Sequence, residues 1–348
     1  MNDYLVIGGG ISGAAAAFEL AAHGATVLVE AEGAPGYHST GRSAALYTRH
    51  FGGPIVRRIN SASATFFTDP PEGFSDHPLL TPRGGLTIAA PGEEDALAAM
   101  LARTADESGE DHGIVAITPD EAFRRAPLLR RERVGAALYE EGIQDIEVAS
   151  LHQGYLRAFK ARGGRLVCDR RIEHLARDSG GWQARAGDET LTARIVVNAA
   201  GAWAGHIGAM AGAADIGLVP KRRTGILLDA PPGLDVGAMP AVDYLSTDAY
   251  WKPDAGKIMA SPGDATPIEP QDAQPDEYDV AVLAAWMEAE TTLTVRRIAH
   301  SWAGLRSFVA DEAPVLGFDG SAEGFFWLAG QGGYGIMMAP ALARATAS

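Results

Sequence analysis

The sequence is poor in cysteine: Cys168 is its single thiol among 348 residues, so no disulfide can form within the chain. A chain without disulfides is typical of reducing compartments, and we therefore expect a cytoplasmic protein. The sequence also lacks CxxC pairs and histidine-rich clusters, which are the usual signs of a zinc site. We expect no metal.

Basic charge and long apolar runs are also scarce. The 29 Lys and Arg residues face 44 Asp and Glu residues, which gives a formal net charge of −15 and argues against nucleic acid or an anionic membrane as a partner. No apolar run is long enough to span a bilayer, and the apolar N-terminus lacks the basic region of a signal peptide. With 47% hydrophobic residues, the composition predicts one large globular domain or two smaller ones.

The first thirty residues are the most informative stretch. Residues 3–7 predict a short buried strand, residues 25–29 predict a second strand, and Glu30 follows directly. A glycine-rich turn and a run of four alanines lie between them, in the order strand, turn, helix, strand, acid. This order is the dinucleotide-binding unit. The glycines that fit its fingerprint are Gly8, Gly10 and Gly13.

Each residue type in this unit has a physical reason. Gly8 permits a tight turn, and Gly10 lets backbone N–H groups approach a pyrophosphate at the helix N-terminus, where Ile11 and Ser12 lie. Gly13 lets the helix pack close to the sheet, and Glu30 lies at the spacing of a carboxylate that binds a ribose hydroxyl. An alanine-rich core helix after a flexible lead-in is the alternative, but it leaves the acid at the strand end unexplained.

The stretch after the first unit favours a flavin over a nicotinamide nucleotide. A nicotinamide domain normally continues with strand–helix alternation, whereas residues 36–45 are polar and loop-like. Residues 195–203 predict a buried strand that ends in Ala-Ala-Gly. Residues 325–330 predict another strand, which enters a second glycine-rich turn at 331–336. Few residues remain after that turn, so we expect a short C-terminal helix.

The rest of the chain predicts a second, antiparallel region. Proline-rich, acidic residues 262–277 indicate an exposed loop. The other predicted helices lie at 48–69, 93–103, after the capping box at 118–121, 151–162 and 280–289. The other predicted strands lie at 86–90, 135–139, 165–168, 182–186, 190–193, 224–229, 249–252, 257–260 and 292–298.

Long stretches of the chain resemble the D-amino-acid oxidase superfamily of FAD enzymes, and within it the D-arginine dehydrogenases. The similarity covers essentially the whole chain and is far more specific than the glycine fingerprint. The stretches that carry it are residues 36–45, 151–157, 197–203, 220–223, 302–311 and 331–336.

The resemblance implies an α/β fold with two domains. A Rossmann-like FAD-binding domain would be assembled from residues 1–78, 146–205 and 302–348. An α+β substrate domain built on an antiparallel sheet would comprise residues 79–145 and 206–301. Sarcosine oxidases of this superfamily attach flavin through a C-terminal cysteine that this chain lacks, so the resemblance implies non-covalent FAD.

The resemblance also implies a reaction. A hydride would pass from the substrate α-carbon to flavin N5, and the imino acid would hydrolyse to a 2-oxo acid and ammonia; oxygen or a quinone would then accept the electrons. Arg223 and Arg306 would clamp the substrate carboxylate, Tyr250 would be a gate or hydrogen-bond donor, and Gly333 would lie in the turn that faces the flavin. Taken alone, distant arginines are more often solvated, and a sheet tyrosine is often merely half-buried.

The cofactor-binding residues implied in this way come from four separate stretches. They are Gly8, Gly10, Ile11, Ser12, Gly13, Glu30, Thr40, Arg42, Ser43, Ala44, Ala45, Ala200, Gly201, Gly332, Tyr334, Gly335 and Ile336.

The chain departs from the arginine-specific pattern in its substrate pocket. Gly85 stands where those relatives carry a glutamate for the guanidinium, and Leu46 and Phe51 stand where they carry a histidine and a tyrosine. A buried cation without a counter-charge is costly, so arginine and lysine should fit poorly unless Asp243 replaces the lost carboxylate. We expect a D-amino-acid dehydrogenase or oxidase that prefers neutral or apolar side chains.

Two other functions stay open at this point. The same scaffold could oxidise glycine, sarcosine or another secondary amine, because each of the amino acids among them has a carboxylate for the arginines. The chain could also be a flavin-binding protein without turnover, although the retained arginines and Tyr250 speak against that.

Overall fold

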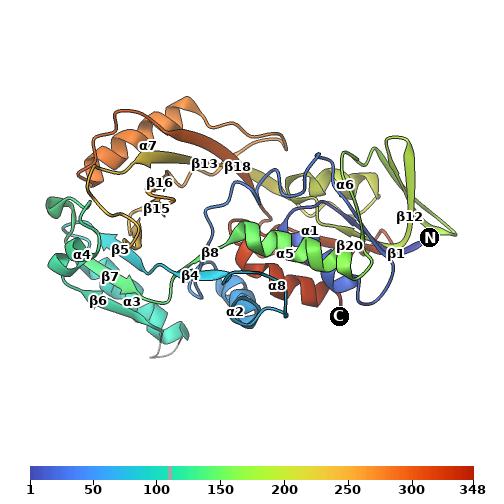
Figure 1. Ribbon diagram of the computed structural model, residues 1–348, viewed down its shortest axis with the longest axis horizontal. Coiled ribbons are helices and arrows are strands. Elements are labelled where there is room, and N and C mark those ends of the chain that lie inside the picture. Colours follow the sequence, from blue (N-terminus) through green and yellow to red (C-terminus); the bar gives the residue numbers. More distant parts are fainter. Residues whose placement is uncertain (109–111) are drawn as a thin grey trace.

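The computed structural model describes residues 1–108 and 112–348. Within these residues the strands form three sheets, of eight, nine and three strands. The molecule is elongated, with the eight-stranded sheet and its helices toward one end and the nine-stranded sheet toward the other (Figure 1). Both chain termini lie in the half that holds the eight-stranded sheet (Figure 1). Among the described helices, none combines the length and the apolarity needed to cross a membrane.

The eight-stranded sheet has a parallel centre. Its parallel strands, in spatial order, are β9 (Arg165–Val167), β2 (Thr26–Val29), β1 (Asn2–Ile7), β12 (Glu189–Asn198) and β20 (Phe325–Ala329). The antiparallel additions are β10 (His174–Asp178) and β11 (Gly181–Ala186) beside β12, and β19 (Val315–Phe318) beside β20. Strand β12 therefore pairs with both β1 and β20, although about 320 residues separate β1 from β20 in the chain.

Alternation along the central strands fixes which side chains meet which layer. On β1, Val6 packs toward one face, while Leu5 and Ile7 pack toward the other. The first face is covered by α1 (Ile11–Leu20), α2 (Pro54–Thr68), α5 (Val148–Ala161) and α8 (Gly335–Thr346) (Figure 1). The second face is covered by the β10–β11 hairpin and α6 (Ala204–Met210). Both faces of the parallel strands are buried, as parallel sheets require.

The nine-stranded sheet is mostly antiparallel and forms the second region. Its strands are β5 (Gly85–Ala89), β6 (Ile114–Ile117), β7 (Ala136–Glu140), β13 (Val219–Asp229), β14 (Ala241–Tyr244), β15 (Thr247–Asp254), β16 (Lys257–Ser261), β17 (Thr266–Pro267) and β18 (His300–Phe308). Its helices are α3 (Glu94–Ser108), α4 (Pro119–Arg125) and α7 (Glu277–Glu290). Leu86 and Trp251 point into the core beneath α4 and α7, so their strand neighbours face the other way, toward the first region.

A small sheet lies between the two regions. It consists of β3 (Leu46–Tyr47), β8 (Gln144–Ile146) and β4 (Leu80–Pro82). On β8, Asp145 accepts from Lys252 at 2.6 Å and from Arg83 at 2.7 Å. Lys252 is 5% exposed. The buried ion pair of Lys252 with Asp145 connects the nine-stranded sheet to the small sheet, and so to the segments that enter the nucleotide region.

Several predicted elements are confirmed. They include the strand–turn–helix–strand unit at the N-terminus, the hairpin of β15 and β16, helix α5, and the strand β20 that leads into α8. The predicted cap also forms, because the Thr118 hydroxyl accepts from the Glu121 N–H at 3.2 Å.

Two predicted elements are wrong in part. Residues 292–298 are not a strand; Thr292 and Val295 bond Leu128 and Glu288 instead of a ladder partner, and the strand β18 begins at His300. The apolar pattern there has another cause, since Leu293 and Val295 pack into the second core. The helix expected from residue 48 begins only at Pro54, after Gly52 turns the chain with φ +84°.

The predicted change of domain at residue 302 falls inside β18, which pairs with β13 along its whole length. We propose that the substrate domain extends to Phe308.

Candidate functional site

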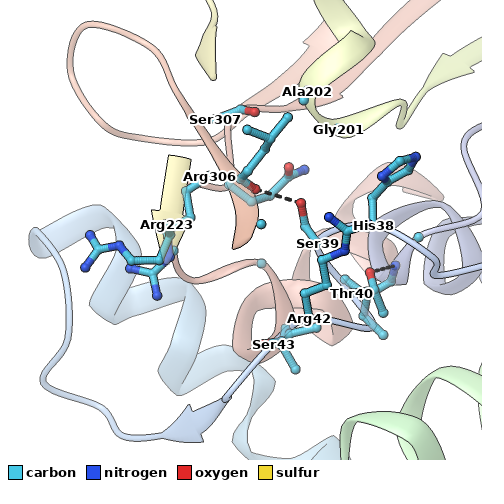
Figure 2. A pocket seen from close by; sticks show the side chains of 18 of the residues that line it. His38, Ser39, Thr40, Arg42, Ser43, Gly201, Ala202, Arg223, Arg306 and Ser307 are labelled. Carbon is cyan, nitrogen blue, oxygen red and sulfur yellow. Dashed lines mark hydrogen bonds between the residues drawn. The ribbon is translucent and has the colours of Figure 1, made fainter. Parts of the chain in front are cut away.

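A cavity of about 650 Å³ lies between the eight-stranded and nine-stranded sheets. Its size is typical of a cofactor or ligand pocket. Residues of both regions line it, from the first glycine-rich turn to strands β13, β14, β15 and β18. Figure 2 shows Arg223 toward one side of the pocket, with His38 and Thr40 on the opposite side. We call the end near Thr40 the nucleotide end and the end near Arg223 the substrate end, after the ligands that the sequence leads us to expect there.

The glycine turn at the nucleotide end has no room for side chains. A Cβ on Gly8, whose φ is +106°, would lie 2.5 Å from the carbonyl oxygen of Ala199. A Cβ on Gly13 would lie 1.8 Å from the carbonyl oxygen of Gly8. Both positions thus require glycine. A Cβ on Gly10, by contrast, would meet only the Thr40 hydroxyl oxygen among the described atoms, at 3.3 Å, and Gly10 lines the cavity with Ile11 and Ser12.

Three side chains hold this turn. Glu30 accepts from the Gly9 N–H at 2.7 Å, the Thr40 hydroxyl accepts from the Ile11 N–H at 3.0 Å, and His152 Nε2 donates to the Gly9 carbonyl at 2.9 Å (Figure 2 draws the Thr40 bond). Burial lowers the pKa of His152, so its ring is neutral at neutral pH. The remaining N–H groups of the first turn of α1 are free to bind an anion.

Glu30 and Arg42 both line the cavity but are held by protein groups. The second oxygen of Glu30 accepts from the Glu32 N–H at 2.9 Å, which leaves the other lone pairs of the carboxylate for a ribose hydroxyl. Arg42 donates to the carbonyls of Ala273 and Ala303 and pairs with Asp272. Its guanidinium therefore ties the loop before Ser43 to the second region instead of pointing freely into the cavity.

The other predicted cofactor residues line the same cavity. Gly201 and Gly332 adopt positive φ values of +56° and +55°, and a Cβ on Gly332 would lie 2.4 Å from the Phe308 ring. Helix α8 begins beside the cavity at Gly335, so its N-terminus faces the space between the two ends. The predicted residues that line the cavity in these segments are Ser43, Ala44, Ala45, Ala200, Gly201, Gly332, Gly333, Tyr334, Gly335 and Ile336.

The substrate end holds two arginines that have no ion-pair partner among the described residues, although the carboxylates of Asp264 and Asp248 are near enough to raise the pKa of Arg223. Arg223 lies opposite Gly304 in the β13–β18 ladder, and Arg306 lies opposite Lys221, so both arginines project from one face of the sheet. Neither forms an ion pair with any described residue. Burial, and then the charge of Arg306, lower the pKa of Arg223, whose buried Nε has no acceptor among the described residues. Two half-buried, unpaired guanidiniums on a cavity wall can bind a carboxylate.

Gly333 explains how Arg306 is accommodated. A Cβ on Gly333 would lie 3.2 Å from Nη1 and 3.4 Å from Cζ of Arg306, so the guanidinium rests against bare backbone. Tyr250 on β15 is half-buried, lines the cavity and is close enough to Arg223 to influence its pKa. Arg223, Arg306, Tyr250 and Gly333 thus meet around one space.

The predicted pocket residues Leu46, Phe51 and Gly85 also line the cavity, with Ile143. A Cβ on Gly85 would lie only 2.3 Å from Cδ1 of Ile143, so an apolar side chain fills the space that a larger residue would need. Phe51 is 38% exposed and lies at the rim. This part of the cavity is mainly apolar.

Asp243 is a charged residue in this mainly apolar part of the cavity. It accepts from the Thr87 hydroxyl at 3.1 Å and lines the cavity. Burial raises its pKa to about 6. Burial also raises the pKa of the neighbouring Glu140, which accepts from Thr48 at 2.7 Å.

Sequence reasoning missed several lining residues. His38 pairs with Glu32 at 2.9 Å and packs against Trp203 in a tilted arrangement, with ring centroids 4.6 Å apart, and all three residues line the cavity. His38, Trp203 and Trp302 lie within stretches that carried the resemblance, so those stretches could have indicated them. Arg170 and Met259 also line the cavity, and no motif marks either one.

These features fit a dinucleotide with a redox ring. Gly8 to Ser12 and the α1 N-terminus suit a pyrophosphate, Glu30 suits a ribose, and the α8 N-terminus suits a ring that gains negative charge. The cavity runs without interruption from these groups to the arginine pair, so a bound dinucleotide could reach a carboxylate ligand.

Comparisons with known proteins agree with this geometry. The chain is 24% identical over 365 residues to glycine oxidase of Geobacillus kaustophilus, covering 97% of this chain and 90% of that protein. It is 24% identical over 402 residues to FAD-dependent oxidoreductase domain-containing protein 1 of Bos taurus, covering 99% and 80%.

Solved structures share the fold. L-α-glycerophosphate oxidase of Mycoplasma pneumoniae with FAD bound superposes with a TM-score of 0.87 at 18% identity, covering 99% of this chain and 93% of the other. The Geobacillus kaustophilus glycine oxidase superposes with a TM-score of 0.85 at 23% identity, covering 99% and 92%. The family described as DAO, FAD dependent oxidoreductase, matches residues 3–348. The chain belongs to this family of FAD-dependent oxidoreductases.

Proposed function

We propose that this flavoenzyme oxidises a D-amino acid with a neutral or apolar side chain to the imino acid, which hydrolyses to a 2-oxo acid and ammonia. The observation that carries the proposal is the pair Arg223 and Arg306, two unpaired guanidiniums on the wall of the cavity that also holds the dinucleotide features. An amino-acid carboxylate is the ligand that this pair fits best.

The chain's own residues would bind and orient the substrate. Arg223 and Arg306 would fix the carboxylate by parallel hydrogen bonds, and Tyr250 would donate to it or close over it. Holding the carboxylate fixes which face of the α-carbon is presented. The chemistry that FAD supplies is acceptance of a hydride from that carbon.

The apolar part of the cavity around Leu46, Phe51 and Gly85 supports the proposed preference for neutral or apolar substrate side chains. Leu46, Phe51 and Ile143 offer apolar surface, and Ile143 fills the space beside Gly85. Selectivity for D-arginine, which the likeness to D-arginine dehydrogenases would suggest, is therefore not what we propose.

Glycine or sarcosine is the second candidate substrate. The relationship to a glycine oxidase, over 97% of this chain, favours it. Both candidates need the arginine pair, and they differ in whether the apolar compartment contributes to binding.

The test is anaerobic reduction of the purified holoenzyme, followed as loss of flavin absorbance. D-leucine, D-phenylalanine, their L-enantiomers, D-arginine, glycine and sarcosine are added one at a time. We expect rapid bleaching by the two apolar D-amino acids alone. Comparable rates with D-arginine and D-leucine would overturn the side-chain preference, and bleaching by glycine or sarcosine alone would favour the second candidate.

The variant Arg306→Ala tests the role of the arginine pair. It should keep its flavin and lose at least about 100-fold in kcat/KM for D-leucine, because a charge-assisted carboxylate clamp is lost. Unchanged activity in this variant would contradict both candidate reactions.

The electron acceptor is a separate question. Reoxidation of the reduced enzyme by oxygen or by a soluble quinone would identify the acceptor. We also propose that the enzyme works in the cytoplasm.

A further inference from the structure

Asp243 is a carboxylate on the cavity wall without a cationic partner. Across the nine-stranded sheet it lies beside Thr87 on β5 and Tyr250 on β15, in one row on the face toward the cavity. Thr87 donates to both oxygens, at 3.1 and 3.3 Å. Within the described residues no Lys, Arg or His forms an ion pair with Asp243.

The charged groups around Asp243 do not neutralise it. On β7, Glu140 is acidic too and makes ionisation of Asp243 harder. On β15, Lys252 faces the same side two residues from Tyr250, but its ammonium is committed to Asp145 at 2.6 Å. At the substrate end of the cavity, the lining arginines are Arg223 and Arg306, which lie on other strands than Asp243. No cation of the described residues therefore neutralises Asp243, and a proton or a cationic group of a ligand could do so.

Asp243 lies where the end of a substrate side chain would reach if the substrate carboxylate were bound by the arginines. Strands β15 and β16 lie between β14, which carries Asp243, and β13, which carries Arg223. At about 4.8 Å between neighbouring strands, β14 and β13 are roughly 14 Å apart. A ligand whose carboxylate meets the arginines would thus extend its side chain, along Tyr250, toward Asp243.

We propose that Asp243 responds to the charge at the end of the substrate side chain: the ionised carboxylate improves the binding of a side chain that ends in an ammonium group relative to an apolar side chain of equal length, and protonation of the acid removes that gain. This inference rests on the proposed function and refines its side-chain preference into one that depends on pH. Because burial places the pKa of Asp243 at about 6, both forms are accessible in an ordinary assay range.

The experiment compares D-lysine with D-norleucine, whose side chains differ in a terminal ammonium against a terminal methyl group. The ammonium of lysine stays charged from pH 5 to 8, so a change with pH reports on the enzyme. We expect the ratio of kcat/KM for D-lysine to that for D-norleucine to rise about 10-fold between pH 5 and pH 7.5, with a single midpoint near 6.

Two variants make the test specific to Asp243. In Asp243→Asn the ratio should be constant with pH and favour D-norleucine throughout. In Thr87→Val the midpoint should move upward, because the Thr87 hydrogen bond lowers the pKa of Asp243. Valine is close in shape to threonine, so the second variant tests the same group without removing it.

The outcomes separate this inference from the proposed function. A ratio that is independent of pH in the unmodified enzyme, or that keeps its pH dependence in Asp243→Asn, overturns the inference alone. Rates that rise with pH by the same factor for both substrates leave the ratio constant and therefore also overturn it. Failure of every D-amino acid to reduce the flavin at any pH overturns the proposed function, and this inference with it.

Discussion

The two ends of the cavity are built in opposite ways. At the nucleotide end the essential feature is missing side chains, since Gly8 and Gly13 leave no room for a Cβ. At the substrate end the essential feature is charged side chains, since Arg223 and Arg306 bring unpaired guanidiniums to one wall. The first end comes largely from one stretch of thirty residues, and the second comes from strands far apart in the chain. The proposed cofactor contacts are thus encoded locally, whereas the proposed substrate contacts depend on the sheet.

The largest effect should come from filling the nucleotide turn. Gly13→Ala would place a methyl group 1.8 Å from the Gly8 carbonyl oxygen, so the helix must move away from the strand. We expect the free energy of unfolding to fall by at least about 3 kcal/mol and FAD to be lost, measured by denaturant unfolding and by the flavin content of the purified protein.

Gly205→Ala is the control for that substitution. Gly205 lies in helix α6, with open space around the position of a Cβ. Alanine there should leave flavin content unchanged and be neutral or slightly stabilising. Equal flavin content in both variants would contradict the role given to the turn.

A smaller effect is expected where bare backbone meets a charged side chain. Gly333→Ala would press against the Arg306 guanidinium, which can shift by a few tenths of an ångström but then loses its alignment with Arg223. We expect kcat/KM for D-leucine to fall about 10-fold with flavin still bound. Gly142→Ala, at a site with open space, should leave kcat/KM unchanged, and an equal loss in both variants would count against the contact.

Asp243, at the substrate end, should also make the thermal stability of the protein depend on pH. Folding raises the pKa of Asp243 from 3.8 to about 6, so the folded protein binds this proton more tightly than the unfolded chain does. The contribution of this group is therefore fully present below pH 3.8 and is lost as the pH rises through 6. Asp243→Asn should raise Tm at pH 7.5 and change it little at pH 4.5.

Asp229 provides the control of opposite sign. Hydrogen bonds from Lys257 and Arg297 lower its pKa, so Asp229→Asn should lower Tm at pH 7.5 and have less effect as the pH falls below the ordinary value of 3.8. If both variants shift Tm in the same direction at pH 7.5, the burial argument for Asp243 is wrong.

The smallest effect concerns the apolar layer behind the nucleotide end, where two tyrosines can be compared. Tyr155 is fully buried, and its hydroxyl has no partner among the described residues, whereas the Tyr47 hydroxyl donates to the Asn60 carbonyl at 3.1 Å. Tyr155→Phe should stabilise the protein by about 1 kcal/mol, and Tyr47→Phe should destabilise it by about 1 kcal/mol. Denaturant unfolding of the two variants measures the difference, and equal changes would contradict this account.

Much of the architecture was predictable because its signals are local. The glycine fingerprint, the apolar strands and the hairpin of β15 and β16 follow from neighbouring residues, and the structure contains each of them. The strand expected at 292–298 failed because apolar residues that enter a core look alike whether or not they pair in a ladder. Arg42 shows a related limit, since its bonds to Ala273 and Ala303 depend on segments about 230 residues or more away.

The sequence by itself determined the dinucleotide unit, because the two positions that exclude a Cβ, Gly8 and Gly13, must be glycine at a fixed spacing. It also determined the acid at the end of β2 and the alternation that buries both faces of the central strands. Only the tertiary structure decided that Arg223 and Arg306 form no ion pair with any described residue, that Gly333 supports Arg306, and that Asp243 shares their cavity. The physical reason is that burial and charge pairing depend on what other segments bring near a side chain, and neighbours in the sequence do not record this.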